Sequence, residues 1–391
     1  MDKYYCDISN DFGDIFGSSE GLRFFSAPGR VNIIGEHIDY CGGLVMPVAL
    51  SKKTTVAARP NGTDIVRLAA TDMPGRLFSF DIKDIEKAKE LPWGNYQAGI
   101  FKEFSERGVK LCGLDMLFDC TVPFGAGLSS SASIELATAA ALNEIFHAGF
   151  DNISLAVLSR HSENTFCGVN CGIMDQFASA MGKKDHAIML DCATLRYEYI
   201  PLELGDHVLV LANTKAKHSL GSSKYNERRR EADEALSDLQ KVLPRKQLCD
   251  YTPEDYIKYS SSVKSEIVRK RAEHIIFENA RVREAAQALR SGDLILLGKI
   301  MRTANDSIRY LYEATGDELD AMFDAAKGLP YCIGSRMTGG GFGGCTVNIV
   351  ESSRTDEFIS VVGKKYTEKT GIVPEFYICE SGNGAKEEQL S

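Results

Sequence analysis

The sequence predicts a globular protein that mixes strands with helices and divides into two or three domains. Its 391 residues exceed the size of one average domain. Hydrophobic residues make up 44% of the chain and charged residues 25%, a composition that allows an ample core. Strand-like runs are frequent in the first half, whereas longer helical runs begin near residue 200. We therefore expect one domain over residues 1–200 and a second over residues 201–391.

Most elements follow from hydrophobic periodicity and from the turn residues between them. Strands are expected over residues 44–50, 54–58, 65–70, 77–80, 114–122, 187–191, 208–211, 332–337, 346–350 and 373–379. Helices are expected from residue 93 onward and over residues 134–146, 154–165, 224–242, 263–289, 293–312, 317–327 and 356–369. Residues 1–22 have weak helical character, and residues 382–391 are expected to fray.

Composition and charge exclude several classes of function. The net charge is −9 and the basic residues are dispersed, so no footprint for nucleic acid is expected. No apolar run approaches the roughly 18 residues that a membrane span needs. The eleven cysteines include no C-x-x-C pair, and the start of the chain is too polar for a secretory signal. Reduced, mostly buried cysteines in a cytoplasmic protein are the favoured interpretation.

Residues 123–132, Pro-Phe-Gly-Ala-Gly-Leu-Ser-Ser-Ser-Ala, lie between a predicted strand and a predicted helix. Glycines let a backbone approach a ligand closely, and a helix start carries unpaired N–H groups and a positive dipole end. Serines there can cap the helix, bind a phosphate or reach a metal ion. Taken alone, this serine loop fits an ordinary capped helix as well as it fits an anion site.

A second stretch, residues 25–43, gathers Arg30, Glu36, His37 and Asp39 between glycines. Short side chains and the absence of lysine favour a ligand-lining loop over a solvated surface loop. A glycine turn over residues 171–176 opens a further short helix.

Two motifs match known functional signatures but stand in the wrong sequence context. The Asp-Phe-Gly of residues 11–13 matches the metal motif of protein kinases, but it lies too early and has no catalytic-loop partner. Gly339, Gly341 and Gly344 satisfy G-x-G-x-x-G, yet they precede a strand near the end of the chain, whereas a dinucleotide site opens a helix after the first strand. Five glycines in six residues still favour close approach to a ligand over a simple turn.

Together the stretches 29–43, 123–132 and 334–345 resemble the small-molecule kinases grouped with homoserine, mevalonate and galactose kinases. Residues 29–40, Gly-Arg-Val-Asn-Ile-Ile-Gly-Glu-His-Ile-Asp-Tyr, are similar to the galactokinase signature, as are residues 171–176 and 335–345. The likeness runs over roughly residues 23–380. It implies an α+β protein with the two-domain GHMP-kinase fold and an active site in the cleft between the domains.

The resemblance also implies a role for each motif residue. The ATP phosphates would be held by Gly125, Ala126, Gly127, Leu128, Ser129, Ser130 and Ser131. The magnesium ligands would be Ser131 and Glu163. Asp175 would be the base that faces the anomeric hydroxyl, and Arg30 would be the cation beside it. Contacts with the sugar hydroxyls would come from Glu36, His37, Asp39, Gly172 and Tyr225.

The implied protein is a monomer that phosphorylates galactose with ATP and Mg²⁺, and binds neither nucleic acid nor membrane. Phosphoryl transfer needs mainly positioning and neutralisation of negative charge. A metal ion, a helix N-terminus and Arg30 would supply positive charge, while carboxylates fix hydroxyls by directional hydrogen bonds. The sequence leaves open whether Asp175 abstracts the proton early or mainly orients the hydroxyl.

Two departures from the galactokinase pattern bear on specificity. Ile38 and Cys41 replace the usual Thr and Asn and resemble the variant signature of N-acetylgalactosamine kinases, so that activity is the alternative. A β-branched residue at position 38 is better explained as packing under the loop. A sugar- and ATP-binding sensor without turnover is the alternative of another class, and the complete set of motif residues favours an enzyme. Asn305 stands where the family often has a histidine, and no role is assigned to it.

Overall fold

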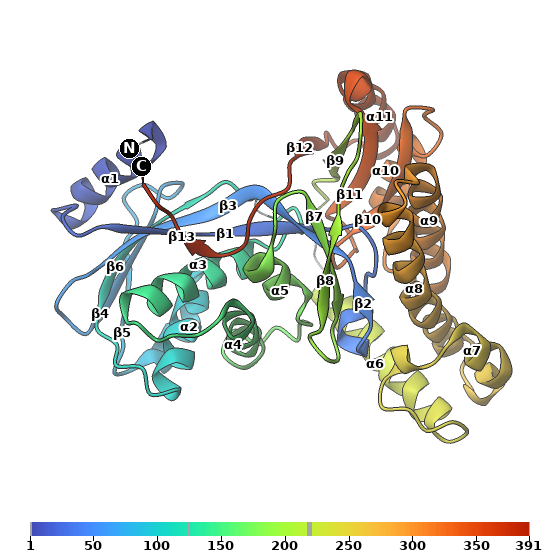
Figure 1. Cartoon of the computed structure of the whole chain (residues 1–391), viewed down its shortest axis with the longest axis horizontal. Coiled ribbons are helices and arrows are strands. Elements are labelled where there is room, and N and C mark those ends of the chain that lie inside the picture. The colour runs from blue at the N-terminus through green and yellow to red at the C-terminus, as the bar shows by residue number, and fades with distance from the viewer. Residues whose placement is uncertain (1, 124, 217–220, 391) are drawn as a thin grey trace.

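The computed structural model describes residues 2–123, 125–216 and 221–390 of the chain. Phe124, which belongs to the predicted serine loop, lies outside the described residues. The described part forms an elongated α+β molecule, with the first half of the chain at one end and most of the second half at the other (Figure 1). The expected division near residue 200 stays a prediction.

A six-stranded sheet dominates the first half. Its strands, in spatial order, are β13 (Lys386–Glu387), β1 (Arg23–Asn32), β3 (Pro47–Pro60), β6 (Leu114–Cys120), β4 (Ile65–Ala70) and β5 (Phe78–Asp81). Only the pair β4–β6 is parallel within it. Residues 44–50 and 54–58, expected as two strands, are β2 (Leu44–Val45) and the single long β3. The polar Ser51, Lys52 and Lys53 interrupt the apolar pattern there, and the pairing with β1 shifts register beside them, but the strand continues through them.

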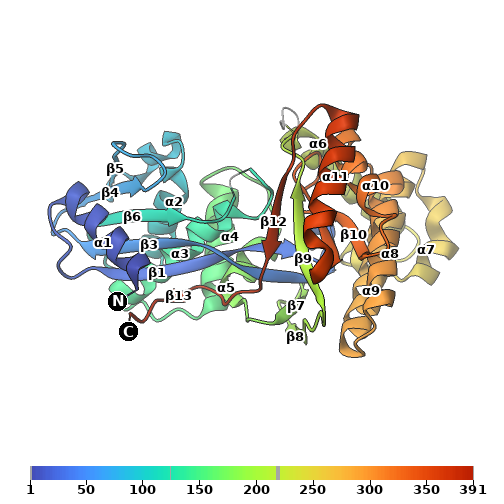
Figure 2. The same cartoon turned by 90° about the horizontal axis from the view of Figure 1, so that it is seen from above.

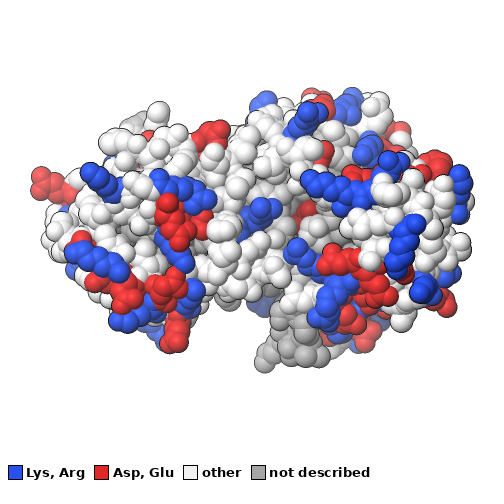
Figure 3. All heavy atoms as spheres, turned by 90° about the horizontal axis from the view of Figure 1, so that it is seen from below, with Lys and Arg blue, Asp and Glu red and all other residues white. Residues whose placement is uncertain are grey.

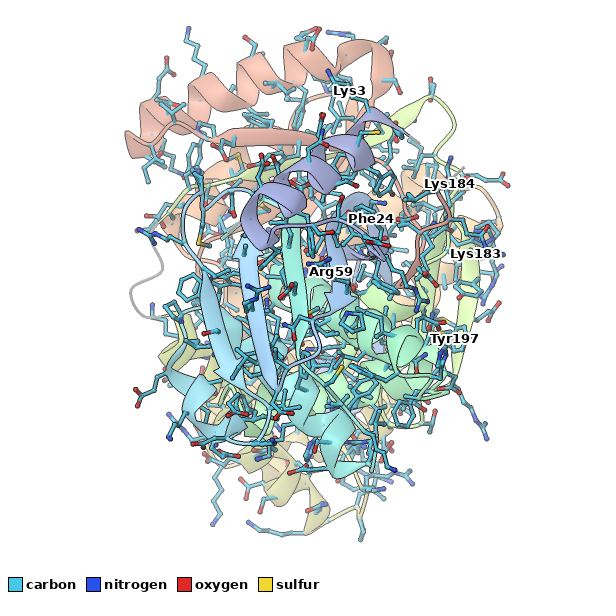
Figure 4. The ribbon with its side chains drawn as sticks, turned by 90° about the vertical axis from the view of Figure 1, so that its left-hand side faces the viewer. Lys3, Phe24, Arg59, Lys183, Lys184 and Tyr197 are labelled. Carbon is cyan, nitrogen blue, oxygen red and sulfur yellow. The ribbon has the colours of Figure 1, made fainter. Side chains whose placement is uncertain are left out.

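Helix α1 (Lys3–Phe16) covers one face of this sheet. Its buried Phe12 and Phe16 pack with Phe24 of β1 and Leu117 of β6. The guanidinium of Arg59 lies 5.5 Å from the ring centre of Phe12. Figure 4 looks onto this face and labels Phe24 and Arg59 beneath the helix. Residues 1–22 therefore contain a regular amphipathic helix, which is stronger structure than their sequence suggested.

The opposite face is covered by four helices that lie together below the sheet in Figure 1. They are α2 (Gly94–Glu106), α3 (Ser130–Ile145), α4 (Asn152–Thr165) and α5 (Met174–Met181). Helix α3 is buried nearly all round, and its alanines allow neighbouring elements to approach closely. This packing fixes the start of α3, where the serine loop ends.

The second half contains a four-stranded antiparallel sheet backed by long helices. The strands, in spatial order, are β10 (Cys332–Thr338), β11 (Cys345–Glu351), β9 (His207–Asn213) and β12 (Glu375–Cys379). The helices are α6 (Gly221–Gln240), α7 (Pro253–Tyr259), α8 (Glu266–Arg290), α9 (Leu294–Ser307), α10 (Asp317–Ala326) and α11 (Thr355–Thr370). A three-stranded sheet of β2, β7 (His186–Asp191) and β8 (Tyr197–Pro201) lies between the two larger sheets (Figure 1).

The C-terminal segment does not fray, so the expectation for residues 382–391 is wrong over its described part. Strand β13 pairs with β1, and Figure 2 shows the last residues running beside that strand. Glu387 accepts two hydrogen bonds of 2.7 Å from Arg23, and Glu388 accepts one of 2.6 Å from Ser26. These partners lie more than 360 residues away in sequence, which is why local pattern could not reveal them.

Three smaller differences concern short elements. Strand β8 and helix α7 carry too few periodic apolar residues to be recognised and were not expected. The helix expected over residues 293–312 is α9 followed by a π-helical turn over Ile308–Tyr312.

No helix among the described residues is long and apolar enough to cross a membrane. On the face seen from below, acidic and basic side chains are interspersed (Figure 3).

Candidate active site

A cavity of about 460 Å³ lies where the two halves of the chain meet. Its lining comes from the signature loop after β1, the turn before α5, the start of α6 and the glycine hairpin between β10 and β11. Cavities of this size hold small-molecule ligands. Nine of the residues assigned from sequence line it: Arg30, Glu36, His37, Asp39, Gly127, Glu163, Gly172, Asp175 and Tyr225.

Arg30 and Asp175 form a bidentate ion pair at the wall of this cavity. Nε and Nη2 of Arg30 donate to the two carboxylate oxygens of Asp175, both at 2.8 Å. Nη1 of Arg30 donates to the carbonyl oxygen of Gly127 at 2.7 Å, and the hydroxyl of Ser129 donates to Asp175 at 2.6 Å. Paired forks of this kind fix geometry as well as charge. Asp175 is therefore held rigidly, while its side chain remains 29% exposed to the cavity.

A β-bulge places Arg30. The register between β1 and β3 shifts between Pro28 and Arg30, so Gly29 sits at the irregularity. A Cβ on Gly29 would lie 2.7 Å from the carbonyl oxygen of Leu128, a distance that no side chain tolerates. The same carbonyl accepts the backbone N–H of Arg30 at 3.1 Å. Glycine at position 29 thus lets the strand touch the serine loop.

The serine loop presents backbone to one side and apolar side chains to the other. Gly125 and Gly127 adopt φ values of 70° and 71° and are exposed, whereas Ala126 and Leu128 are buried. Ser129 has a φ of 59° and does not cap α3 with its hydroxyl, which is bonded to Asp175 instead. The loop therefore offers its N–H groups and the start of α3, as an anion site would.

The glycine hairpin packs directly against this loop. A Cβ on Gly339 would lie 3.1 Å from the carbonyl oxygen of Gly127, and Cys345 donates to the carbonyl of Ala126 at 2.9 Å. Gly341 has a φ of 71°, and a Cβ there would meet the carbonyl of Ala314 at 1.9 Å. Glycine at positions 339 and 341 therefore lets the hairpin approach the serine loop and Ala314 closely beside the cavity.

His37 joins the signature loop to the hairpin. It adopts a φ of 62°, a conformation that is uncommon outside glycine and is often found at functional sites. Its Nε2 lies 3.1 Å from the carbonyl oxygen of Gly340, and its Nδ1 lies 2.8 Å from the hydroxyl of Tyr40. A carbonyl can only accept, so Nε2 carries the proton and Nδ1 accepts from Tyr40. Burial lowers the pKa of His37 to about 4, which keeps the ring neutral near pH 7.

Glu36 belongs to a buried ion network. Arg336 of β10 donates to the carboxylate of Glu36 and also lies 3.4 Å from Glu278 of α8, which Arg281 approaches to 2.7 Å. One carboxylate oxygen of Glu36, Oε1, is buried without a partner. Burial raises the pKa of Glu36, whereas Arg281 and Arg336 outweigh burial at Glu278 and lower its pKa to about 2.

Asp39 and Gly172 are in close contact across the cavity wall. A Cβ on Gly172 would lie 1.8 Å from the carboxylate of Asp39, so only glycine fits there. Burial and the nearby charge of Asp175 raise the pKa of Asp39 to about 6. The ring of Tyr225 lies 5.3 Å from that of His37 and closes this side of the cavity.

Glu163 sits in an acidic pocket at the serine-loop end. Ser131 donates a hydrogen bond to its carboxylate, and so does the side-chain amide of Gln176. The same amide reaches the fully buried Glu135 at 3.3 Å. Burial and the charge of Asp175 raise the pKa of Glu163, and burial and Glu163 raise that of Glu135.

No group of three or more His, Cys, Asp or Glu side chains in the described ranges is arranged to hold a metal ion. The residues present nevertheless fit magnesium. A hydroxyl and a carboxylate are oxygen donors, and Mg²⁺ is usually held by one or two carboxylates together with substrate phosphates. Glu163 and Glu135 share a neutral amide, and no cation among the described residues is paired with either acid.

Several predicted residues fall outside the cavity lining. Of the described serine-loop residues, Gly127 lines the cavity and the others do not. Ile38 and Cys41 are buried in the core and do not line it, which agrees with the packing role expected for Ile38. Asn305 is buried, and its side-chain oxygen accepts the N–H of Met337 at 2.9 Å.

Sequence reasoning missed the supporting residues of the site. Arg336, Glu278 and Tyr312 hold its residues in place, and Tyr312 lies 2.7 Å from the hydroxyl of Tyr40. Only Arg336 carried a signal, because it lies within residues 335–345, the stretch that is similar to the galactokinase signature.

Comparison with known protein families gives three matches. The galactokinase galactose-binding signature matches residues 10–60, the N-terminal domain of GHMP kinases matches residues 95–183, and their C-terminal domain matches residues 285–368.

Individual relatives match over nearly the whole chain. A galactokinase of Bacillus subtilis strain 168 is 44% identical over 383 residues, which cover 97% of this chain and 98% of the relative. A galactokinase of Clostridium tetani is also 44% identical, with 97% of both chains covered. The crystal structure of Lactococcus lactis galactokinase complexed with galactose superposes with a TM-score of 0.96 at 35% identity, covering 98% of this chain and all of that one. The mevalonate kinase of Methanococcus jannaschii shares the fold, with a TM-score of 0.69 at 16% identity.

Proposed function

Because the chain belongs to the galactokinase family, we propose that it transfers the γ-phosphoryl group of ATP to the anomeric hydroxyl of galactose. The oxygen of that hydroxyl forms a bond to the γ-phosphorus, and the bond from phosphorus to the bridging oxygen of ADP breaks. The products are galactose 1-phosphate and ADP, and the hydroxyl proton passes to an acceptor in the site.

One observation carries this proposal. The bidentate pair of Arg30 and Asp175 is bonded at once to the serine loop, through Gly127 and Ser129, and faces the cavity lined by the signature loop. A sugar hydroxyl and a phosphate can therefore meet beside one carboxylate. Positioning of the reactants and electrostatic stabilisation together supply almost all of the catalysis in phosphoryl transfer.

Asp175 is the proposed acceptor for the hydroxyl proton. Its exposed side faces the cavity while Arg30 and Ser129 hold the other, so its orientation is set before substrate enters. Arg30 also offers fixed positive charge beside the transferring group. We propose that the N–H groups of the serine loop, residues 125–131, hold the phosphates of ATP.

The sugar would be held by the acids and rings of the opposite wall. The unpartnered Oε1 of Glu36 and the carboxylate of Asp39 are acceptors for hydroxyl groups. The hydroxyl of Tyr225 and the backbone at Gly172 lie in the same lining. Both ring nitrogens of His37 are already bonded within the protein, so we assign it the role of holding the loop against the hairpin.

We propose that Ser131 and Glu163 hold the magnesium ion that accompanies ATP. Bound there, the ion would neutralise phosphate charge and act as a Lewis acid toward the phosphoryl oxygens. Gln176 would keep the carboxylate of Glu163 in place by its hydrogen bond.

The test is a coupled assay of ADP release over a panel of sugars with ATP and magnesium. Galactose should give the highest kcat/KM, since Ile38 and Cys41, the two hints toward N-acetylgalactosamine, are core residues. An unpaired buried polar group costs about 1–3 kcal/mol, so N-acetylgalactosamine should be worse by roughly tenfold to a hundredfold. A higher kcat/KM for N-acetylgalactosamine would overturn the choice of sugar, and ADP release with no sugar would overturn the reaction.

We further infer that the protein works in the cytoplasm, where ATP is available. None of its eleven cysteines forms a disulfide, which supports a reducing compartment.

A further inference from the structure

A second cavity, of about 280 Å³, lies behind the sugar side of the candidate active site. The two cavities share Asp39, Cys171 and Gly172 as a common wall. The rest of the lining is Tyr40, Gly42, Ile173 and Cys192, together with four polar side chains. Helix α4, helix α6 and the segment before α7 contribute these four, which are Arg160, Asn164, Arg229 and Gln247. Nothing in the phosphoryl-transfer chemistry uses these four side chains.

Neither arginine in this lining is paired with a carboxylate among the residues that the structure describes. Arg160 makes no hydrogen bond or ion pair with the described residues, and its Nε is buried without an acceptor. Arg229 donates to the carbonyl oxygen of Asn170 at 2.9 Å, and its guanidinium lies 5.6 Å from the ring centre of Tyr40. The neighbouring Arg228, in contrast, is paired with Glu231 at 3.1 Å and with Glu227. A buried donor left without an acceptor costs free energy, so an acceptor from outside would be favoured.

The charge balance of the cavity is positive. Its lining holds two guanidinium groups and one carboxylate, that of Asp39, so the net charge is positive even when Asp39 is ionised. Asn164 and Gln247 add side-chain amides. Gln247 is pressed against Gly42, where a Cβ would come within 1.7 Å of its amide oxygen. Two forked cations with adjacent amides match the oxygens of a phosphate group better than those of a single carboxylate.

We propose that this cavity, lined by Arg160, Arg229, Asn164 and Gln247, is a second ligand site that binds a phosphate group, free or as a monoester. The volume admits either source. The ligand would link Arg160 of α4 to Arg229 of α6 and so tie the first half of the chain to the second. It would also brace residues 168–171, which line the sugar cavity and to which Arg229 is already bonded.

This bracing predicts coupling between the two cavities. A loop already held in place loses less freedom when the sugar binds, so phosphate and galactose should each bind more tightly in the presence of the other. The factor by which galactose tightens phosphate binding must equal the factor by which phosphate tightens galactose binding, because coupling between binding sites is reciprocal. This coupling, unlike phosphate binding itself, rests on the proposed function.

The experiment is calorimetric titration of inorganic phosphate, and separately of glycerol 2-phosphate, into the protein saturated with a non-hydrolysable ATP analogue and magnesium. The analogue is needed because the serine loop would itself attract phosphate. We expect saturable binding at millimolar concentrations. Arg160→Gln and Arg229→Gln should each weaken it by about tenfold or more, since each removes a charge-assisted contact. Arg160→Lys should lie between the parent and Arg160→Gln.

Arg230→Gln is the matched control, because Arg230 is an exposed neighbour on the same helix that does not line the cavity. It should bind phosphate as the parent does. Equal binding by the parent and Arg160→Gln, or no saturable binding of either probe, overturns the proposal. Binding of only one probe supports the site and identifies the source of the phosphate group.

A repeat with galactose present tests the coupling. An unchanged phosphate affinity overturns the bracing. If the protein turns over no sugar at all, the proposed function fails, while the titrations without galactose still decide the phosphate site. Circular dichroism of each variant reports whether it is folded.

Discussion

Two groups of buried carboxylates flank the candidate active site, and they differ in whether a cation is paired with them. Glu36 and Glu278, on one side, share Arg336 and Arg281, so two acids meet two guanidinium groups. Glu163 and Glu135, on the other side, share only the neutral amide of Gln176. Each acid of the first group is paired with an arginine, whereas no cation among the described residues is paired with either acid of the second group.

The pKa values of Glu278 and Glu135 follow this difference, whereas burial raises the pKa of Glu36 even beside Arg336. Arg281 and Arg336 overcome burial and lower the pKa of Glu278 to about 2, whereas no cation offsets burial at Glu135 and its pKa is raised well above the ordinary value. Burying an unpaired charge is costly, and a protein keeps such a group only as a neutral acid or as part of a site that a cation enters. The comparison supports the proposal that the acid-rich side holds the metal ion, and it makes the paired side a structural support.

The largest effect is expected for Asp175→Asn. Asp175 adds negative charge to the unpaired side, where it raises the pKa of Glu163, and it is the proposed proton acceptor. The amide keeps the shape but cannot accept the proton, so kcat should fall by about 10²–10⁴-fold. Binding of an ATP analogue, measured by calorimetry, should survive because the serine loop is intact. A folded variant with near-normal turnover would remove Asp175 from the mechanism.

The paired side can be broken by Arg336→Met. This change leaves Glu36 and Glu278 buried without their shared partner, and removing one member of a buried ion pair costs about 3–5 kcal/mol in the free energy of unfolding. Urea denaturation measures the loss. Arg354→Met is the control, because Arg354 pairs with Glu357 at the surface and should cost under about 1 kcal/mol. Similar losses for the two variants would mean that the network is not a support.

Glu163→Gln tests the unpaired side. The amide removes a carboxylate ligand, and the magnesium concentration for half-maximal activity should rise by about tenfold or more. The affinity for galactose should stay nearly unchanged, because Glu163 lies at the serine-loop end, beside Ser131. Superimposable magnesium titrations of the variant and the parent would assign Glu163 a structural role.

The sequence predicted the residues of the site better than their supports. Arg30 and Asp175 lie within compact motifs, so their types and spacing were visible, whereas Glu163 was assigned through the family resemblance. Arg336 meets Glu36 across 300 residues, and its pairing depends on how β10 is placed beside the signature loop. No local pattern encodes a contact of that separation.

The fold shows the same limit. Helices with regular apolar spacing were predicted almost to their ends, as with α10 and α11. The pairing of β13 with β1 was not predicted. Glu387 and Glu388 look like part of a polar tail in the sequence, because their partners Arg23 and Ser26 lie far away along the chain. Signals that depend on a distant partner are absent from the local sequence.

The smallest effect, and the sharpest test of the comparison, is expected for Glu135→Gln. Glu135 keeps its proton in the folded protein at a pH where the unfolded chain has lost it, so its contribution to stability falls as pH rises above about 4.5. A glutamine resembles the protonated acid, so the change should cost under about 1 kcal/mol at pH 5 and less at pH 8. Glu278→Gln, the same substitution at an equally buried site, removes a charge that Arg281 and Arg336 require, and should cost about 3–5 kcal/mol at pH 7. Because the pKa of Glu278 is lowered, that cost should shrink as pH falls from about 4.5 toward 2, where the parent loses the same charge. Urea unfolding of both variants over this pH range measures the difference, and equal costs at pH 7 would show that the two groups of carboxylates are not opposites.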